Sequence, residues 1–175
     1  MQIQTVGVIG AGQMGNGIAH VMALSDYDVV LHDVSADALN ASLQTIERNL
    51  VRQVTRGHIT EAAKEAAFAR IHTQADLAAL GNADLIIESA TEREEIKQSI
   101  FDNLLEHLAQ HTILTSNTSS ISITRLASRT DRPEKFMGFH FMNPVPLMQL
   151  VELIRGIATD QETFDTCKAV VAKLG

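Results

Sequence analysis

The chain has 175 residues, of which 45% are hydrophobic, so it can bury one good-sized core without help from disulfides or metals. Its 14 Lys and Arg against 21 Asp and Glu give a formal net charge of −7, which argues against nucleic-acid binding because phosphate neutralisation needs clustered basic residues. A single cysteine, the lack of a basic signal-peptide start and the lack of any run near the roughly 20 apolar residues of a membrane span predict a cytoplasmic protein that contacts no membrane.

Short apolar runs alternate with longer helical patterns along the chain. This alternation predicts a doubly wound α/β domain of the Rossmann type with a mainly parallel sheet. Two helices in succession after the second strand predict an inserted helical hairpin, with Ser35 as the N-cap of the first helix and Gly57 as its end. No shift in composition divides residues 1–175, so we expect one domain. The expected strands are 6–9, 28–33, 71–72, 84–88, 112–116, 136–141 and 149–154, and the expected helices are 14–24, 35–56, 60–69, 92–110, 122–128 and 159–174.

A glycine-rich turn directly follows the first expected strand. Residues 10–15 read GAGQMG and match G-x-G-x-x-G, a weak signal that gains weight from the strand before it and the helix after it. Gly10 permits a tight turn, Gly12 allows the backbone to approach a pyrophosphate, and Gly15 lets the helix lie close to the sheet. Free N–H groups at the helix start favour phosphates there. The expected dinucleotide contacts of this turn are Gly10, Ala11, Gly12, Gln13, Met14 and Gly15.

An acidic residue closes the second expected strand. Asp33 follows Gly10 at roughly the 20-residue spacing of the acid that binds the adenosine ribose hydroxyls in such sites. Its charge would repel a 2′-phosphate, and Val34 and Ser35 after it offer no arginine to accept one. The sequence therefore predicts NAD rather than NADP as the cofactor. FAD, which uses a similar fingerprint, stays open as an alternative on this pattern alone.

A second polar cluster lies between residues 116 and 152. His140 ends an apolar strand, Asn143 follows it before a Pro-Val-Pro turn, and Glu152 lies in the next strand-like run. A carboxylate on an apolar strand needs a partner, and His140 is the natural one. A histidine held by a carboxylate suits the removal of a proton from an alcohol while a hydride moves to nicotinamide, and Ser119 and Asn143 could hold the reacting groups. A core histidine and an unrelated surface acid explain the same pattern equally well.

Three stretches of the chain resemble the L-3-hydroxyacyl-CoA dehydrogenases, including the bacterial 3-hydroxybutyryl-CoA dehydrogenases. They read VGVIGAGQMGNGIA, SNTSS and HFMNPVPLMQLVE, and the likeness covers the whole chain. The resemblance implies oxidation of (S)-3-hydroxyacyl-CoA to 3-oxoacyl-CoA with formation of NADH, in fatty-acid β-oxidation or butanoate metabolism. It implies His140 as the general base, Glu152 as the residue that orients it, and Ser119 and Asn143 as contacts of both substrate and cofactor.

The same resemblance extends to the cofactor's nicotinamide ribose and to CoA. It implies cofactor contacts at Glu92 and Lys97. Family members contact CoA through a serine and a lysine on the long helix after the second strand, where this chain has Asn49 and Arg56, both able to bind phosphate or a hydroxyl. The family also has a second, helical domain that supplies an active-site asparagine, covers the acyl chain and forms a homodimer. We expect this chain to lack that domain and to bind NAD with little turnover on its own.

Several alternatives stay open from the sequence. The domain could serve an NAD-dependent dehydrogenase of a free hydroxy acid or sugar acid, a non-catalytic NAD-binding module, or a larger multifunctional β-oxidation protein. His107 and His111 have the i, i+4 spacing of a metal pair, but no third ligand is near them in the sequence, so we expect no metal site. Cys167 is expected to pack within its helix.

Overall fold

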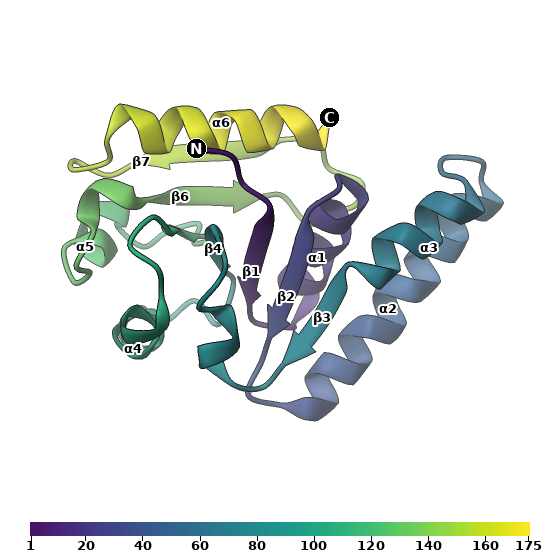
Figure 1. Ribbon diagram of the computed structural model, residues 1–175, viewed down its shortest axis with the longest axis horizontal. Coiled ribbons are helices and arrows are strands. Elements are labelled where there is room, and N and C mark those ends of the chain that lie inside the picture. Colours follow the sequence, from purple (N-terminus) through teal and green to yellow (C-terminus); the bar gives the residue numbers. More distant parts are fainter.

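A seven-stranded sheet organises the computed structural model, which describes residues 1–175 (Figure 1). The strands are β1 (Thr5–Ile9), β2 (Asp28–His32), β3 (Ile71–Gln74), β4 (Leu85–Glu88), β5 (Ile113–Ser116), β6 (Phe136–Phe141) and β7 (Val151–Arg155). Their order across the sheet is β3-β2-β1-β4-β5-β6-β7. All pairs are parallel except β6 and β7, which are antiparallel. The predicted doubly wound, mainly parallel fold is confirmed.

Helices cover both faces of this sheet. They are α1 (Gln13–Leu24), α2 (Ala36–Thr55), α3 (Glu61–Ala69), α4 (Glu94–Leu104), α5 (Ile123–Ala127) and α6 (Gln161–Leu174), with short 3-10 turns η1 (Leu77–Leu80), η2 (Leu105–His107) and η3 (Pro133–Lys135). The expected cap is in place on α2, because the Ser35 side chain accepts a hydrogen bond from the Ala38 N–H. Asp160 caps α6 in the same way through the Thr163 N–H. None of these helices combines the length and the hydrophobicity that a membrane-spanning helix requires.

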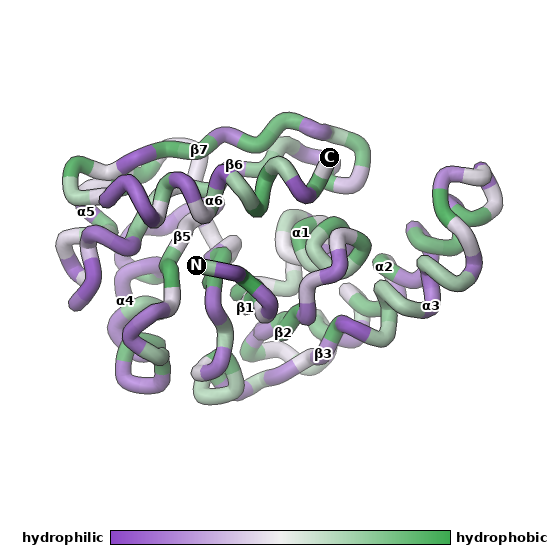
Figure 2. Tube along the Cα trace, turned by 45° about the horizontal axis from the view of Figure 1, so that its top comes forward, coloured by the Kyte–Doolittle hydropathy of each residue, from purple (hydrophilic) through white to green (hydrophobic).

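The apolar residues form a core on each face of the sheet. One core packs the strands against α1, α2, α3 and α6, with Ile18 and Ile46 fully buried in it. The other packs them against α4, α5 and η1 around Phe101 and Leu126. Figure 2 shows the hydrophobic segments gathered along the strands and the inner sides of the helices. Because both faces are covered, β4 is buried at all four positions, as parallel strands usually are.

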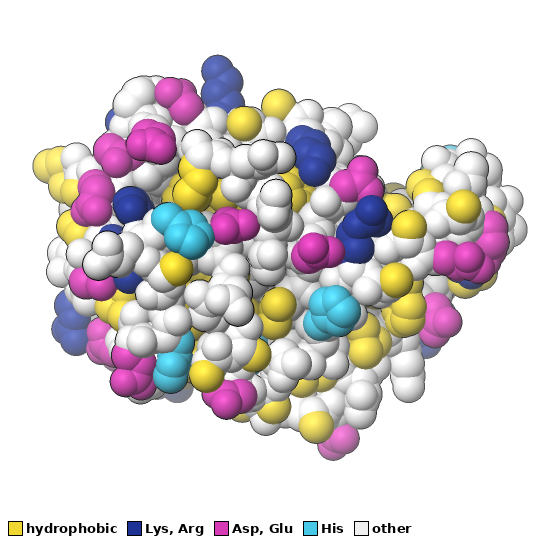
Figure 3. Space-filling model, viewed as in Figure 1, with side chains coloured by type: hydrophobic (Ala, Val, Ile, Leu, Met, Phe, Trp, Pro, Cys, Tyr) yellow, Lys and Arg dark blue, Asp and Glu magenta, His cyan; other side chains and the backbone are white.

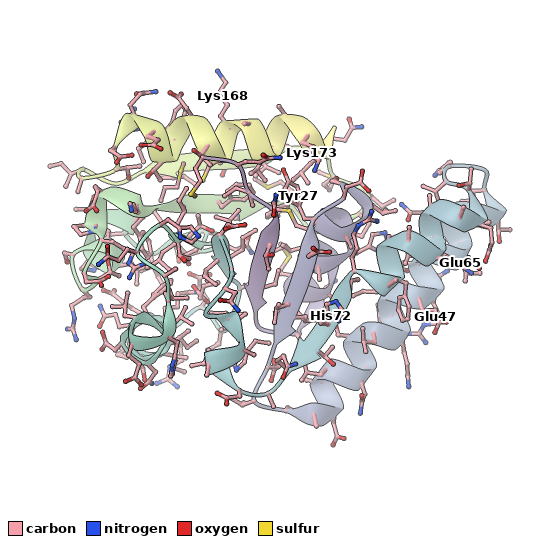
Figure 4. All side chains as sticks on the ribbon, viewed as in Figure 1. Tyr27, Glu47, Glu65, His72, Lys168 and Lys173 are labelled. Atoms are coloured by element: carbon pink, nitrogen blue, oxygen red, sulfur yellow. The ribbon has the colours of Figure 1, made fainter.

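Two helical features lie outside the central layers. Helices α2 and α3 pack side by side as the predicted hairpin, which extends away from the sheet (Figure 1). Helix α6 packs along β6 and β7, and its Lys173 ammonium lies 4.0 Å from the ring centre of Tyr27, just before β2 (Figure 4). This cation–π contact ties the C-terminal helix to the first half of the sheet.

Several predicted boundaries differ from those of the structure. The helix expected over 92–110 begins at Glu94 and ends at Leu104, then tightens into η2 before Leu108 adopts an extended conformation. Leu104 is fully buried, and the chain turns here to enter β5 rather than carry a longer helix past the sheet edge. The last strand begins at Val151 rather than at residue 149, because pairing with β6 starts only opposite Phe141.

Candidate active site

The sheet has one switch point, between β1 and β4. From β1 the chain proceeds outward through β2 and β3, then returns to the other side of β1 at β4. Ligands of open α/β sheets bind beyond the carboxyl ends of the strands at such a point. The two strand ends are joined there by Ser89, whose N–H and Oγ both donate to the Ile9 carbonyl oxygen, at 2.8 and 2.9 Å. The crevice therefore lies where the glycine-rich turn follows β1.

The glycines of this turn have distinct surroundings. Gly10 has a backbone φ angle of +98°, which residues other than glycine rarely adopt. A Cβ on Gly15 would collide with the Gly10 carbonyl oxygen, so α1 can start this close to β1 only with glycine there. A Cβ on Gly12 would meet no atom within 4 Å. Gly12 therefore faces open space, as a backbone site for an approaching pyrophosphate requires.

Asp33 is fixed beside this turn by two backbone hydrogen bonds. Its Oδ2 accepts from the Ala11 N–H and its Oδ1 from the Ser35 N–H, both at 2.9 Å. A cavity of about 440 Å³ opens here, with Gly10 and Asp33 in its wall, a size typical of ligand pockets. The open glycine turn, the fixed acid and this cavity together fit a bound dinucleotide.

His140 and Glu152 form the pair that the sequence predicted. They lie directly opposite each other in the β6–β7 register, with His140 Nδ1 2.9 Å from Glu152 Oε2. The histidine side chain is 19% exposed and the glutamate side chain 53% exposed. The hydrogen bond leaves Nε2 as the ring nitrogen without a protein partner, so it is the atom available for proton transfer.

The polar residues after β5 reach the same end of the sheet. Asn117 Oδ1 accepts a 2.7 Å hydrogen bond from the Phe141 N–H, next to His140, and so extends the β5–β6 ladder by a side chain. Ser119 and Asn143 are exposed on the loops after β5 and β6, and neither side chain makes a hydrogen bond within the protein. Both are therefore free to bind a ligand.

Glu88 and Lys97 form a fully buried ion pair beneath these loops. The Lys97 Nζ lies 2.8 and 3.0 Å from the two Glu88 carboxylate oxygens, with the side chains 1% and 0% exposed. Glu88 also accepts hydrogen bonds from the Ser116 Oγ at 2.6 Å and the Ala90 N–H at 2.7 Å. The pair thus joins the ends of β4 and β5 to α4, and the role expected for Lys97 as a cofactor contact stays a prediction.

Glu92 lies on the exposed loop before α4. Its carboxylate accepts a hydrogen bond from the Thr118 hydroxyl, which connects the loop after β4 to the loop that carries Ser119. This position above the strand ends is compatible with the cofactor contact expected of Glu92, and that contact too stays a prediction.

A separate basic hollow of about 360 Å³ lies between α2 and the loop after β6. Asn49 and Arg56, the two residues expected to contact CoA, both line it. Its remaining lining residues are His20, Arg52, Gln53, His58, Pro144, Pro146 and Leu147. Two arginines and two histidines line this one hollow, and the arginines suit a phosphate-bearing ligand.

Three histidines that belong to no sequence motif line the two cavities described above. His20 Nε2 lies 2.8 Å from Gln53 Oε1 at the base of the basic hollow, and burial lowers the pKa of His20, partly opposed by that hydrogen bond. His58 lines the same hollow, and His32 lines the crevice cavity. The position of His32 directly before Asp33, at the end of a buried strand, is the one sequence signal that could have singled it out.

His111, one of the two histidines with the i, i+4 spacing of a metal pair, has an acidic partner in the structure. His111 Nε2 pairs with Asp84 Oδ1 at 3.0 Å, at the opposite end of β4 from the crevice. No group of three His, Cys, Asp or Glu side chains is arranged to hold a metal ion. Acidic and basic side chains are interspersed over the face seen in Figure 3, without a continuous basic surface.

The switch-point crevice, the open glycine turn and the fixed acid define a Rossmann-type dinucleotide-binding domain. Residues 5–175 match the family described as 3-hydroxyacyl-CoA dehydrogenase, NAD binding domain. The chain therefore belongs to the 3-hydroxyacyl-CoA dehydrogenase family, and NAD is its cofactor.

Individual relatives agree with the family match. The chain is 61% identical over 99% of its length to a 3-hydroxybutyryl-CoA dehydrogenase of Bradyrhizobium diazoefficiens and spans 59% of that protein. It is 45% identical over 94% of its length to a 3-hydroxyadipyl-CoA dehydrogenase of Escherichia coli and spans 35% of that one. The solved (S)-3-hydroxybutyryl-CoA dehydrogenase of Ralstonia eutropha superposes with a TM-score of 0.97 at 42% identity, over 99% of this chain and 62% of that one.

Proposed function

We propose that this domain serves an enzyme that oxidises (S)-3-hydroxyacyl-CoA, including short-chain 3-hydroxybutyryl-CoA, to 3-oxoacyl-CoA with NAD. The observation that carries the proposal is the 2.9 Å hydrogen bond between His140 Nδ1 and Glu152 Oε2 on the strands beyond the NAD crevice. A purely structural NAD holder has no need of a partly exposed histidine braced in this way.

The pair suits the proton side of the reaction. Bound NAD supplies the nicotinamide carbon that takes the hydride from C3 of the substrate. The proton of the 3-hydroxyl group would pass to His140 Nε2, because Nδ1 is already held by Glu152. The carboxylate keeps the ring in one tautomer and balances the positive charge that the ring gains. Ser119 and Asn143, with free side chains on the adjoining loops, would bind the substrate oxygen and the cofactor.

The basic hollow supports a CoA thioester rather than a free acid. Asn49 and Arg56 line it together with Arg52 and His58, so several donors for phosphate lie in one place. The loop after His140 supplies Pro144 and Pro146 to the same hollow. A ligand bound there would therefore extend from α2 toward the catalytic strand, whereas a small hydroxy acid would leave the hollow unused.

We infer that a second, helical domain completes the active site, covers the acyl chain and forms a homodimer, and that the enzyme works in the cytoplasm. The chain spans 59% and 60% of two bacterial relatives named for 3-hydroxybutyryl-CoA dehydrogenase, which leaves room for such a domain in them.

The substrate class is tested by comparing two reductions with NADH. A protein that joins this domain to the inferred helical domain, called the longer protein below, should reduce acetoacetyl-CoA and leave free acetoacetate almost untouched. Arg56→Gln should raise the KM for acetoacetyl-CoA with little change in the KM for NADH. Equal turnover of free acetoacetate would support a dehydrogenase of free hydroxy acids instead. Binding of NADH with no turnover of either compound would support a non-catalytic module.

A further inference from the structure

The carboxylate of Glu88 is a buried junction beneath the crevice. Glu88 ends β4, is 0% exposed and accepts hydrogen bonds from Lys97 Nζ at 2.8 and 3.0 Å. It also accepts from the Ala90 N–H at 2.7 Å and from the Ser116 hydroxyl at 2.6 Å. A carboxylate can stay charged away from water when such donors surround it and a cation is paired with it. Its partners come from three segments, which are the loop after β4, the end of β5 and helix α4.

The loop after β4 connects this junction to the glycine turn. Ser89 donates to the Ile9 carbonyl oxygen at the end of β1, and the next residue, Ala90, donates to Glu88. A Cβ on Gly10 would lie 2.8 Å from the Ser89 carbonyl oxygen and 3.0 Å from the Ala90 nitrogen, so this loop touches the glycine turn directly. Ala90 also lines the crevice cavity. Glu88 therefore holds one wall of the crevice in place from below.

The Ser116 hydroxyl connects the same junction to the loop after β5. Besides donating to Glu88, it accepts a hydrogen bond from the Thr118 N–H at 3.3 Å, at the start of the loop that carries Ser119. The intervening residue, Asn117, donates its backbone N–H to the Glu88 carbonyl oxygen at 2.8 Å, and its side chain anchors the end of β6. The loop expected to hold the substrate is therefore fixed to the same point as the crevice wall.

We propose that Glu88 and Ser116 are positioning residues for hydride transfer, because their hydrogen bond sets the loop after β5 relative to the NAD crevice. The inference rests on the proposed function, since it assigns both residues a part in that reaction. Both side chains are fully buried, so they act through the loops they join rather than on a ligand. Reacting atoms must be held about 3–3.5 Å apart, and a displacement of about 1 Å can cost roughly 100-fold in rate.

Thr115 provides a matched control in the same strand. It is also 0% exposed, and its hydroxyl donates to the Ile86 carbonyl oxygen of β4 at 2.8 Å. Ser116 and Thr115 thus each make a buried hydrogen bond from β5 to β4, but only the Ser116 hydroxyl also bonds to the loop after β5. Ser116→Ala and Thr115→Val each remove one such bond. Glu88→Gln is less suitable, because it would leave the Lys97 ammonium buried without an opposite charge.

The test measures the rate of NADH formation in a single turnover of the longer protein, with (S)-3-hydroxybutyryl-CoA and saturating NAD. A single turnover reports the chemical step apart from product release. Ser116→Ala should lower this rate by roughly 10-fold, while the Kd for NAD stays within about threefold of the parent. Thr115→Val should stay within about twofold of the parent rate. The melting temperatures of the two variants should fall by similar amounts, since each loses one buried hydrogen bond.

The same measurements can overturn the inference. Equal single-turnover rates in Ser116→Ala and Thr115→Val would show that the bond to Glu88 has no part in hydride transfer beyond that of any buried bond. An unchanged rate in Ser116→Ala with a large rise in its Kd for NAD would also overturn it, since Ser116 would then support binding alone. A parent protein that binds NAD but forms no NADH from the thioester would instead contradict the proposed function.

Discussion

His140 and Glu152 face each other across the only antiparallel strand pair of the sheet, with Nδ1 and Oε2 2.9 Å apart. Their opposition follows from the β6–β7 register, so the backbone itself holds the two side chains together. Twelve residues separate the two in sequence, and the loop between them lines the basic hollow. His140 is thus connected through its ring to Glu152 and through the following loop to the proposed CoA site.

Glu152→Gln should slow turnover while NAD binding persists. The amide cannot balance a charge on the ring and can present an N–H instead of an acceptor oxygen to Nδ1. We expect kcat for acetoacetyl-CoA reduction to fall by roughly 10- to 100-fold, part of the 10²–10⁴-fold that a positioned acid–base group contributes. Steady-state kinetics of the longer protein and the Kd for NAD check this together. Glu152→Asp should retain more activity than Glu152→Gln, and the reverse order would refute the bracing role.

Gly12→Ala should weaken NAD binding, whereas Gly15→Ala should destabilise the fold. An added methyl group at Gly12 meets nothing within 4 Å, so the protein should fold normally but bind NAD less tightly, because the methyl occupies the pyrophosphate approach. At Gly15 the methyl collides with the Gly10 carbonyl oxygen, so we expect a loss of about 1–3 kcal/mol or more in the free energy of unfolding. Thermal melts with and without NAD distinguish the two. Equal melting temperatures in the absence of NAD would contradict this assignment.

Asn117→Ala should loosen the catalytic strand end. The Phe141 N–H, on a residue that is 2% exposed, would lose its 2.7 Å bond to Asn117 Oδ1. An unsatisfied buried donor costs about 1–3 kcal/mol of stability, and turnover should fall with His140 less firmly placed. Asn117→Asp keeps an acceptor oxygen at this position and serves as the control. A chemical denaturation curve for Asn117→Ala that matches the parent would show that this bond does not anchor the strand.

Cys167 should be unreactive in the folded protein and should make stability sensitive to alkaline pH. Its side chain is fully buried, and burial raises the pKa of the thiol from 9.0 to about 12. The unfolded chain loses the thiol proton above pH 9 while the folded protein keeps it, so this contribution to stability is complete below pH 9 and declines as pH rises toward 12. Iodoacetamide should label Cys167 only after denaturation. Melting temperatures should fall more steeply above pH 9 in the parent than in Cys167→Ala. Parallel plots of melting temperature against pH for the two proteins would contradict a contribution of the buried thiol.

Sequence periodicity predicted the elements whose ends depend on local chemistry. The long helix α2 begins after its Ser35 cap, and Gly57 lies just past its end with a φ of +73°. The order of strands and helices along the chain was also predictable. Parallel strands that are covered on both faces are continuous apolar runs in the sequence, and these alternate with helical patterns. The early end of α4 at Leu104 was not, because it depends on where the chain must enter β5.

The site was predictable to the extent that its residues carry a motif. His140, Glu152 and the glycine turn were found in this way, and the structure pairs the first two. The burial of Lys97 against Glu88, nine residues apart, was not visible, because α4 must fold back over β4 before the two side chains meet.

The most direct test of the account is the turnover of His140→Gln in the longer protein, measured together with its affinity for NAD. We predict that kcat for acetoacetyl-CoA reduction falls by at least about 10²-fold while the Kd for NAD stays within about twofold, because the glutamine amide cannot take up or return the proton. Turnover within about threefold of the parent at unchanged NAD affinity would show that His140 is not the proton acceptor.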